Sequence, residues 1–127
     1  MSKLLVVDDE ANIRTLYADE LSDEGYEVVT AANIAEATEK LQAGAFDLAV
    51  LDIKLRNESG IELLQKLVKE RHEMPVILCS AFSCYKEDFS SWLADGYVVK
   101  SGDLTELKNE IARVLAKKAQ KVKTDLK

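Results

Sequence analysis

The chain has 127 residues and a formal net charge of −6, with 47% apolar and 31% charged residues. This length suits one domain with one core, and the apolar content excludes an intrinsically disordered chain. No apolar run approaches the roughly 20 residues of a membrane-spanning helix, and the start of the chain is not a signal peptide. We therefore expect a cytoplasmic protein with no membrane insertion.

The charge is distributed unevenly along the chain. Residues 117–127 contain five Lys and one Asp and carry +4, which leaves −10 on residues 1–116. Contacts to phosphate supply most of the affinity of nucleic-acid binders, so an acidic domain with a short basic tail is not expected to bind nucleic acid. We predict one domain over 1–116, followed over 117–127 by a basic helical extension or linker.

Five strand-like segments alternate with five helix-like segments. We predict strands over 3–7, 26–30, 47–51, 76–79 and 97–99. Apolar residues recur at helical spacing in the segments 13–21, 34–41, 61–68, 89–93 and 104–115. The first, third and fourth strands are continuous apolar runs, which is typical of parallel strands that are covered on both faces.

This alternation predicts an α/β fold with right-handed crossovers and a parallel sheet between two layers of helices. Five strands in a chain of this length match a flavodoxin-like (βα)5 three-layer sandwich with strand order 2-1-3-4-5. Gly25, Gly44 and Gly96 each stand between a helix and the next strand, where we expect a left-handed residue. Gly60 is expected in the loop before the third helix.

Polar residues stand at the carboxyl ends of four of the five predicted strands. Asp8 and Asp9 follow the first strand, Asp52 the third, Ser80 the fourth and Lys100 the fifth. In the order 2-1-3-4-5 these strand ends are neighbours at the edge where open parallel sheets bind ligands. Taken singly, each residue is more simply a helix-capping acid, a turn residue, a loop hydroxyl or a surface lysine. Their joint occurrence favours one shared site.

Three carboxylates in one cleft repel one another unless a cation lies among them. Oxygen ligands and a partly hydrated site suit Mg²⁺. Lys100 adds a second positive charge and Ser80 a hydroxyl donor, so the site would stabilise a phosphoryl group electrostatically. Asp52 would then be the nucleophile and form an aspartyl phosphate.

Four segments carry a specific family resemblance: LLVVDDE at 4–10, LAVLD at 48–52, MPVILCSA at 74–81 and GYVVK at 96–100. In their spacing and order they resemble a response-regulator receiver domain of two-component signal transduction. The resemblance covers nearly the whole chain, from residue 3 to about residue 116.

The resemblance implies that Asp52 is phosphorylated by a sensor histidine kinase, a phosphotransfer protein or a small phosphodonor. Asp9, Asp52 and the backbone carbonyl of Lys54 would bind Mg²⁺, or Mn²⁺ in its place, and Asp8 would act through a coordinated water. The domain would assist only its own phosphorylation and dephosphorylation, and would not be an enzyme with a separate substrate.

Ser80 and Lys100 would contact the phosphoryl group, and Tyr97 would be the switch aromatic that moves inward when Ser80 is drawn toward it. The resemblance places the response on the face formed by the fourth helix, the fifth strand and the fifth helix. This face would bind an unidentified downstream protein and is a candidate for homodimer formation. The chain has Ser101 where the family usually has Pro, and a cis bond before a non-proline residue costs about 3 kcal/mol or more.

The main competing hypothesis is a receiver-like protein-interaction module that does not use phosphorylation. A hydrolase with a separate substrate ranks below it, because the single histidine, His72, is expected far from the carboxyl edge. A flavodoxin would need a phosphate-cradling loop after the first strand, and a dinucleotide-binding fold would need G-x-G-x-x-G there. That loop is Asp-Asp-Glu, which favours neither fold.

Overall fold

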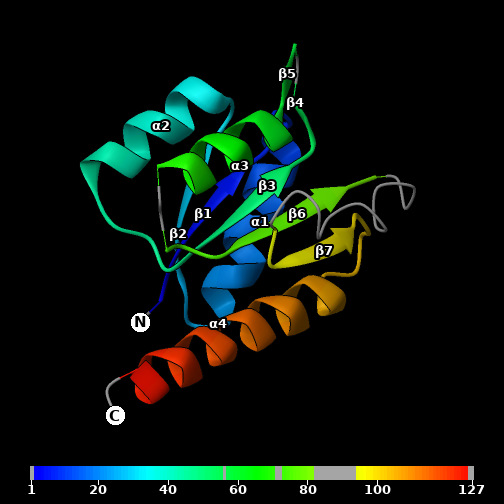
Figure 1. Cartoon of the computed structure of the whole chain (residues 1–127). Coiled ribbons are helices and arrows are strands. Elements are labelled where there is room, and N and C mark those ends of the chain that lie inside the picture. The colour runs from blue at the N-terminus through cyan, green and yellow to red at the C-terminus, as the bar shows by residue number, and fades with distance from the viewer. Residues whose placement is uncertain (1, 56, 71–72, 82–93, 126–127) are drawn as a thin grey trace.

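The computed structural model describes residues 2–55, 57–70, 73–81 and 94–125 (Figure 1). The predicted fourth helix at 89–93 and His72 lie outside these residues. The described helices are α1 (Ala11–Asp23), α2 (Ile34–Ala43), α3 (Gly60–Lys69) and α4 (Thr105–Asp125). The strands of the main sheet are β1 (Lys3–Val7), β2 (Glu27–Ala31), β3 (Leu48–Asp52), β6 (Val76–Ser80) and β7 (Gly96–Val99).

The main sheet is parallel throughout, with the strand order β2-β1-β3-β6-β7. This is the predicted order 2-1-3-4-5, because β4 (Lys54–Leu55) and β5 (Glu58–Ser59) form a separate antiparallel hairpin. The flavodoxin-like α/β fold is therefore confirmed. Every strand of the main sheet begins and ends within one residue of the predicted position. Asp52 and Ser80, predicted just after their strands or at their ends, are the last residues of β3 and β6.

Helices cover both faces of the sheet (Figure 1). Leu5 and Val7 of β1 belong to the core cluster that contains buried residues of α2 and α3, whereas Leu4 and Val6 belong to the cluster with α1 and α4. Every residue of β3 and β6 is buried. This burial on both sides explains why the central strands are continuous apolar runs in the sequence.

Helix α4 continues beyond residues 104–115, the segment in which apolar residues recur at helical spacing. Leu107, Ile111 and Val114 dock its first half on the sheet. The helix then continues to Asp125, so most of the basic segment 117–127 extends it. Within the described part of the chain, no helix combines the length and the apolar character needed to cross a membrane.

Two of the three glycine predictions were wrong. Gly25 has the expected left-handed conformation, with φ 93°, but Gly44 leaves α2 in an extended conformation, with φ −169°. Gly96 lies inside β7 without a left-handed φ, and a Cβ there would stand 2.7 Å from a carboxylate oxygen of Glu110, whose side chain would have to shift. The left-handed residue that the sequence did not reveal is Asn57, with φ 62°, at the turn of the β4–β5 hairpin.

Gly60 is the first residue of α3 and lies against the end of β3. An added Cβ would overlap the backbone carbonyl oxygen of Asp52. The Gly60 N–H also donates to the carbonyl oxygen of Ile53 at 2.8 Å. The start of α3 is thus in direct backbone contact with the residue that carries the candidate nucleophile.

We expect Gly60→Ala to lower the free energy of unfolding by about 2 kcal/mol or more, because neither backbone can move away without disturbing β3 or α3. Gly102→Ala is the matched control, since a Cβ there meets no atom within 4 Å. Its change should stay within about 0.5 kcal/mol. Urea unfolding measures both variants, and equal midpoints would show that the Gly60 contact is not tight.

Candidate functional site

Four neighbouring strands bring the predicted polar residues to one edge of the sheet. Asp8 directly follows β1, Asp52 ends β3, Ser80 ends β6 and Lys100 directly follows β7. The Lys100 N–H donates to the Ser80 carbonyl oxygen at 2.7 Å, which extends the pairing of β6 with β7 by one residue. The peptide bond that follows Lys100 is trans.

Lys100 joins two acids that lie far apart in the sequence. Its Nζ lies 2.8 Å from Asp8 Oδ2 and 2.9 Å from Asp52 Oδ2. Asp8 is 2% exposed and Asp52 is 5% exposed. Two buried carboxylates therefore share one ammonium group, and the pair keeps an excess of one negative charge.

The other oxygens of these two acids accept backbone hydrogen bonds. Asp8 Oδ1 accepts from the Glu10 N–H at 2.9 Å, and Asp52 Oδ1 accepts from the Lys54 N–H at 3.2 Å. The Asp9 carboxylate, in contrast, accepts no hydrogen bond from the described part of the chain and is partly exposed. Carboxylate oxygens of Asp8, Asp9 and Glu10 lie within 4.8 Å of one another, a spacing that could hold a metal ion.

The electrostatics of the site follow from burial and from the shortage of positive charge. Burial raises the pKa of the Asp52 carboxyl to about 6; the Lys100 ammonium opposes this rise and the Asp8 charge adds to it. Burial alone would lower the pKa of Lys100, but its hydrogen bonds to Asp8 and Asp52 outweigh burial and raise it above its usual range. Lys100 is thus positively charged at neutral pH.

Ser80, the last residue of β6, and Tyr97, the second residue of β7, are both buried, at 2% and 4% exposed. Tyr97 belongs to the core cluster that contains buried residues of α2 and α3. The backbone of Lys54 contacts the site through Asp52, whereas its side chain is exposed. The structure thus brings Asp8, Asp52 and Lys100 into direct contact at the edge. Asp9, in contrast, clusters with Asp8 and Glu10, and Tyr97 lies within β7 opposite Leu78 of β6.

Arg14 is a site neighbour that the sequence did not single out. Its Nη1 donates to the backbone carbonyl oxygen of Asp8 at 2.7 Å and so fixes the loop after β1. Arg14 stands in the first turn of α1, from which a long side chain can reach back over the preceding loop. Nothing in the sequence distinguishes it from an ordinary surface arginine.

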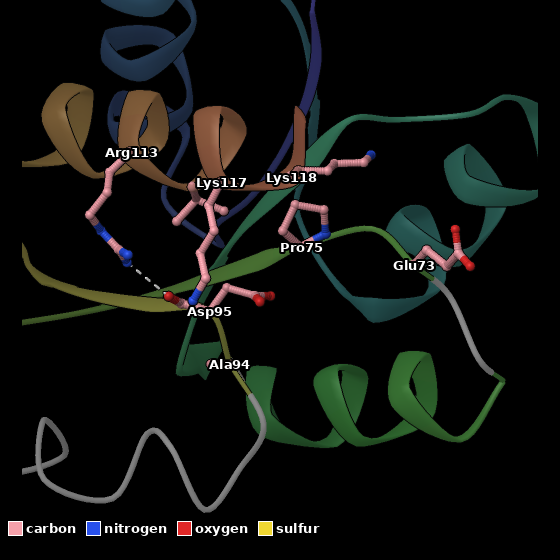
Figure 2. A pocket seen from close by; sticks show the side chains of 8 residues that line it. Glu73, Pro75, Ala94, Asp95, Arg113, Lys117 and Lys118 are labelled. Atoms are coloured by element: carbon pink, nitrogen blue, oxygen red, sulfur yellow. Dashed lines mark hydrogen bonds between the residues drawn. The ribbon is translucent and has the colours of Figure 1, made fainter. Parts of the chain in front are cut away.

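A cavity of about 540 Å³ lies at the opposite, amino-terminal ends of β6 and β7 (Figure 2). Arg113 and Lys117 of α4 extend toward Asp95, and Arg113 donates to its carbonyl oxygen at 3.0 Å. Asp95 Oδ2 also accepts from the Val76 N–H at 2.8 Å. These contacts connect β6, β7 and α4, and none of the predicted site residues lines the cavity.

A family model described as the response regulator receiver domain matches residues 4–112. The chain belongs to the response-regulator receiver family. This receiver domain is 37% identical over 115 residues to the DNA-binding transcriptional regulator NtrC of Rhizobium meliloti, covering 89% of the chain and 24% of NtrC. It is 38% identical over 126 residues to the probable transcriptional regulator ycf27 of Porphyra purpurea, covering 98% and 51%. The receiver domain thus spans about a quarter of the length of the first relative and about half of the second.

Solved structures show the same architecture. The receiver domain is similar to the response regulator TrrA of Thermotoga maritima in complex with Mg²⁺ and BeF, with TM-score 0.83, 46% identity and coverage of 90% and 99% of the two chains. It is also similar to a chain in the complex of histidine kinase ThkA with TrrA, with TM-score 0.82, 46% identity and coverage of 91% and 99%. A CheY-like receiver of Methanospirillum hungatei gives TM-score 0.87, 31% identity and coverage of 95% and 98%.

The raised pKa of Asp52 makes the stability of the receiver domain depend on pH. Because the folded-state pKa of about 6 exceeds the ordinary value of 3.8, folding favours the protonated carboxyl, and this contribution is lost as pH rises from about 4 through 6. In metal-free buffer we expect Asp52→Asn to be more stable than the wild type by about 2 kcal/mol above pH 7. The gain should shrink as pH falls from 6 to 4.

Urea unfolding at several pH values, with EDTA present, measures this difference. Asp23→Asn is the control for removing one negative charge, because Asp23 is exposed at the end of α1, away from Asp52 and Lys100. An Asp52→Asn variant that is less stable than the wild type at pH 8 would contradict the charge excess at this edge.

Proposed function

We propose that this receiver domain accepts a phosphoryl group on Asp52, in a reaction that requires Mg²⁺ and is not enzymatic toward any separate substrate. The observation that carries the proposal is the position of Asp52 at the centre of the carboxyl edge, buried, with Lys100 at 2.9 Å. The donor would be a sensor histidine kinase, a phosphotransfer protein or a small phosphodonor.

The residues at this edge fit a hard divalent cation: Asp8 and Asp52 share the single positive charge of Lys100, and carboxylate oxygens of Asp9 and Glu10 lie within 4.8 Å of Asp8. Asp9, Asp52 and the Lys54 carbonyl would hold Mg²⁺, or Mn²⁺ in its place. Asp8, whose oxygens accept from the Glu10 N–H and from Lys100, would act through a coordinated water, as the family resemblance implies. The bound cation would supply positive charge that counters the charge of the phosphoryl oxygens.

The transfer itself is a displacement at phosphorus. An Asp52 carboxylate oxygen forms the new bond while the bond from phosphorus to the donor's nitrogen or oxygen breaks, and the donor keeps that electron pair and takes up a proton. Lys100 and the Ser80 hydroxyl would offer positive charge and a hydrogen bond to the transferred group. Both belong to backbone segments held by the sheet, so little reorganisation is needed.

Two structures that contain one relative support this proposal. TrrA, at 46% identity, was solved with Mg²⁺ and BeF and also with the histidine kinase ThkA. We propose the same class of partner and the same metal for this domain. The competing hypothesis, an interaction module without phosphorylation, does not explain why two buried carboxylates share a single positive charge.

The response would pass through Ser80 and Tyr97. Phosphorylation would stabilise the arrangement in which Ser80 is drawn to the phosphoryl group and the Tyr97 ring is buried, and it can shift the population only by its preference for that arrangement. The face affected would include β7 and the helix α4 that follows it. We propose this face as the binding surface for a downstream protein or for a second copy of the chain.

Intact-mass analysis after incubation with a small phosphodonor tests the phosphoacceptor. We expect one phosphoryl adduct in the presence of Mg²⁺, none with EDTA, and none in Asp52→Ala. Asp23→Asn should be labelled like the wild type, since Asp23 is exposed on α1, away from this edge. An adduct that persists in Asp52→Ala would place the acceptor elsewhere, and no adduct in any folded sample would favour the interaction module.

The metal assignment predicts a difference between two acids. Asp9→Asn should weaken Mg²⁺ binding by about tenfold or more, because it removes a direct ligand, whereas Asp23→Asn should leave the affinity unchanged. Isothermal titration calorimetry with Mg²⁺ alone gives the dissociation constants. Equal values for Asp9→Asn and the wild type would contradict the proposed ligand set.

A further inference from the structure

Glu58 joins two segments that lie 24 residues apart in the sequence. It stands on β5 of the β4–β5 hairpin, and its Oε1 accepts a hydrogen bond from the Ile34 N–H, the first residue of α2, at 3.2 Å. The hairpin projects from the end of β3 (Figure 1). The contact therefore ties the tip of this hairpin to the start of a different helix.

The start of α2 cannot satisfy this amide by itself. The N-cap residue Asn33 accepts from the Glu36 N–H at 2.8 Å, and the Glu36 carboxylate accepts from the Ala32 N–H at 3.0 Å. Neither of these local hydrogen bonds involves the Ile34 N–H, which donates to Glu58 instead. A carboxylate is also the favourable partner here, since the N-terminal end of a helix carries partial positive charge.

Both ends of this contact lead to the phosphoacceptor site. On one side, the hairpin begins at Lys54, whose N–H donates to Asp52 Oδ1. On the other side, the β2–α2 junction is anchored to the loop that follows β1 and contains Asp8 and Asp9. The Ala31 carbonyl oxygen accepts a hydrogen bond from the Asp8 N–H at 3.1 Å. The proposed metal ligand Asp9 and Glu58 line the same depression, of about 470 Å³.

We propose that Glu58 is a positioning residue for the reaction at Asp52. It clamps the β4–β5 hairpin to α2 and so fixes the Lys54 backbone relative to the acids that follow β1 and the acid that ends β3. The inference rests on the proposed function for its consequence, since the Lys54 carbonyl is a proposed Mg²⁺ ligand. The clamp itself can be measured in EDTA, without Mg²⁺. The two can therefore be tested separately.

The first test is residue-resolved amide hydrogen exchange by NMR in EDTA. Glu58→Ala should speed exchange of both the Ile34 and the Lys54 amides by about threefold to tenfold. Glu58→Gln keeps the acceptor oxygen and should stay within about twofold of the wild type. Glu39→Ala is the matched charge control, because Glu39 is exposed on α2 and outside the contact.

The second measurement is calorimetric titration with Mg²⁺ alone. Glu58→Ala should weaken binding about threefold to tenfold, with Glu58→Gln and Glu39→Ala near the wild-type affinity. If Glu58→Ala accelerates exchange at Ile34 only and leaves Lys54 and the Mg²⁺ affinity unchanged, Glu58 is merely a cap of α2 and the proposal is wrong. It is equally wrong if Glu58→Gln behaves like Glu58→Ala. If the wild type bound no Mg²⁺, the proposed function would be wrong. The exchange rate of the Lys54 amide in Glu58→Ala would still test whether Glu58 holds the hairpin in place.

Discussion

The site depends on a charge imbalance: two buried carboxylates, Asp8 and Asp52, share the single ammonium of Lys100. Buried charge is costly when it is incompletely paired, and the cost appears as the raised pKa of Asp52. The edge of the sheet therefore favours any additional positive charge that can reach it. The metal binding and the phosphoryl transfer proposed at Asp52 would both draw on this same imbalance.

The fold makes the imbalance tolerable by holding the groups rigidly. Asp52 ends a strand that is buried on both faces, and Gly60 brings the backbone of α3 against its carbonyl oxygen. The N–H groups of Glu10 and Lys54 pair with the carboxylate oxygens that Lys100 does not contact. Each acid thus has a fixed orientation, so little reorganisation is needed when a ligand arrives.

Much of this architecture could be predicted from the sequence, because burial and strand direction leave simple patterns. Continuous apolar runs identified the central strands, and the rule that ligands bind at the carboxyl edge placed Asp8, Asp52, Ser80 and Lys100 together. The strand order followed from the number of alternating elements and was correct.

The remaining features arise from contacts between distant segments, which a single sequence does not encode in any local pattern. Three contacts are of this kind: the ion pairs of Lys100 with both acids, the hydrogen bond from α2 to Glu58, and the hydrogen bond from Arg14 to the Asp8 carbonyl oxygen. The Gly96 error has the same origin: a Cβ there would meet the side chain of Glu110, which comes from a different element. The β4–β5 hairpin was missed because its strands have only two residues each.

The most direct measurement is an NMR titration of the ¹³C-labelled Asp52 carboxyl group, first with EDTA and then with Mg²⁺. The account predicts a pKa of about 6 in the metal-free domain and a marked fall when Mg²⁺ is added, because the cation supplies the missing positive charge. A pKa near the ordinary value of about 4 that Mg²⁺ does not change would contradict it, since the buried acids would then carry no excess charge for a cation to relieve.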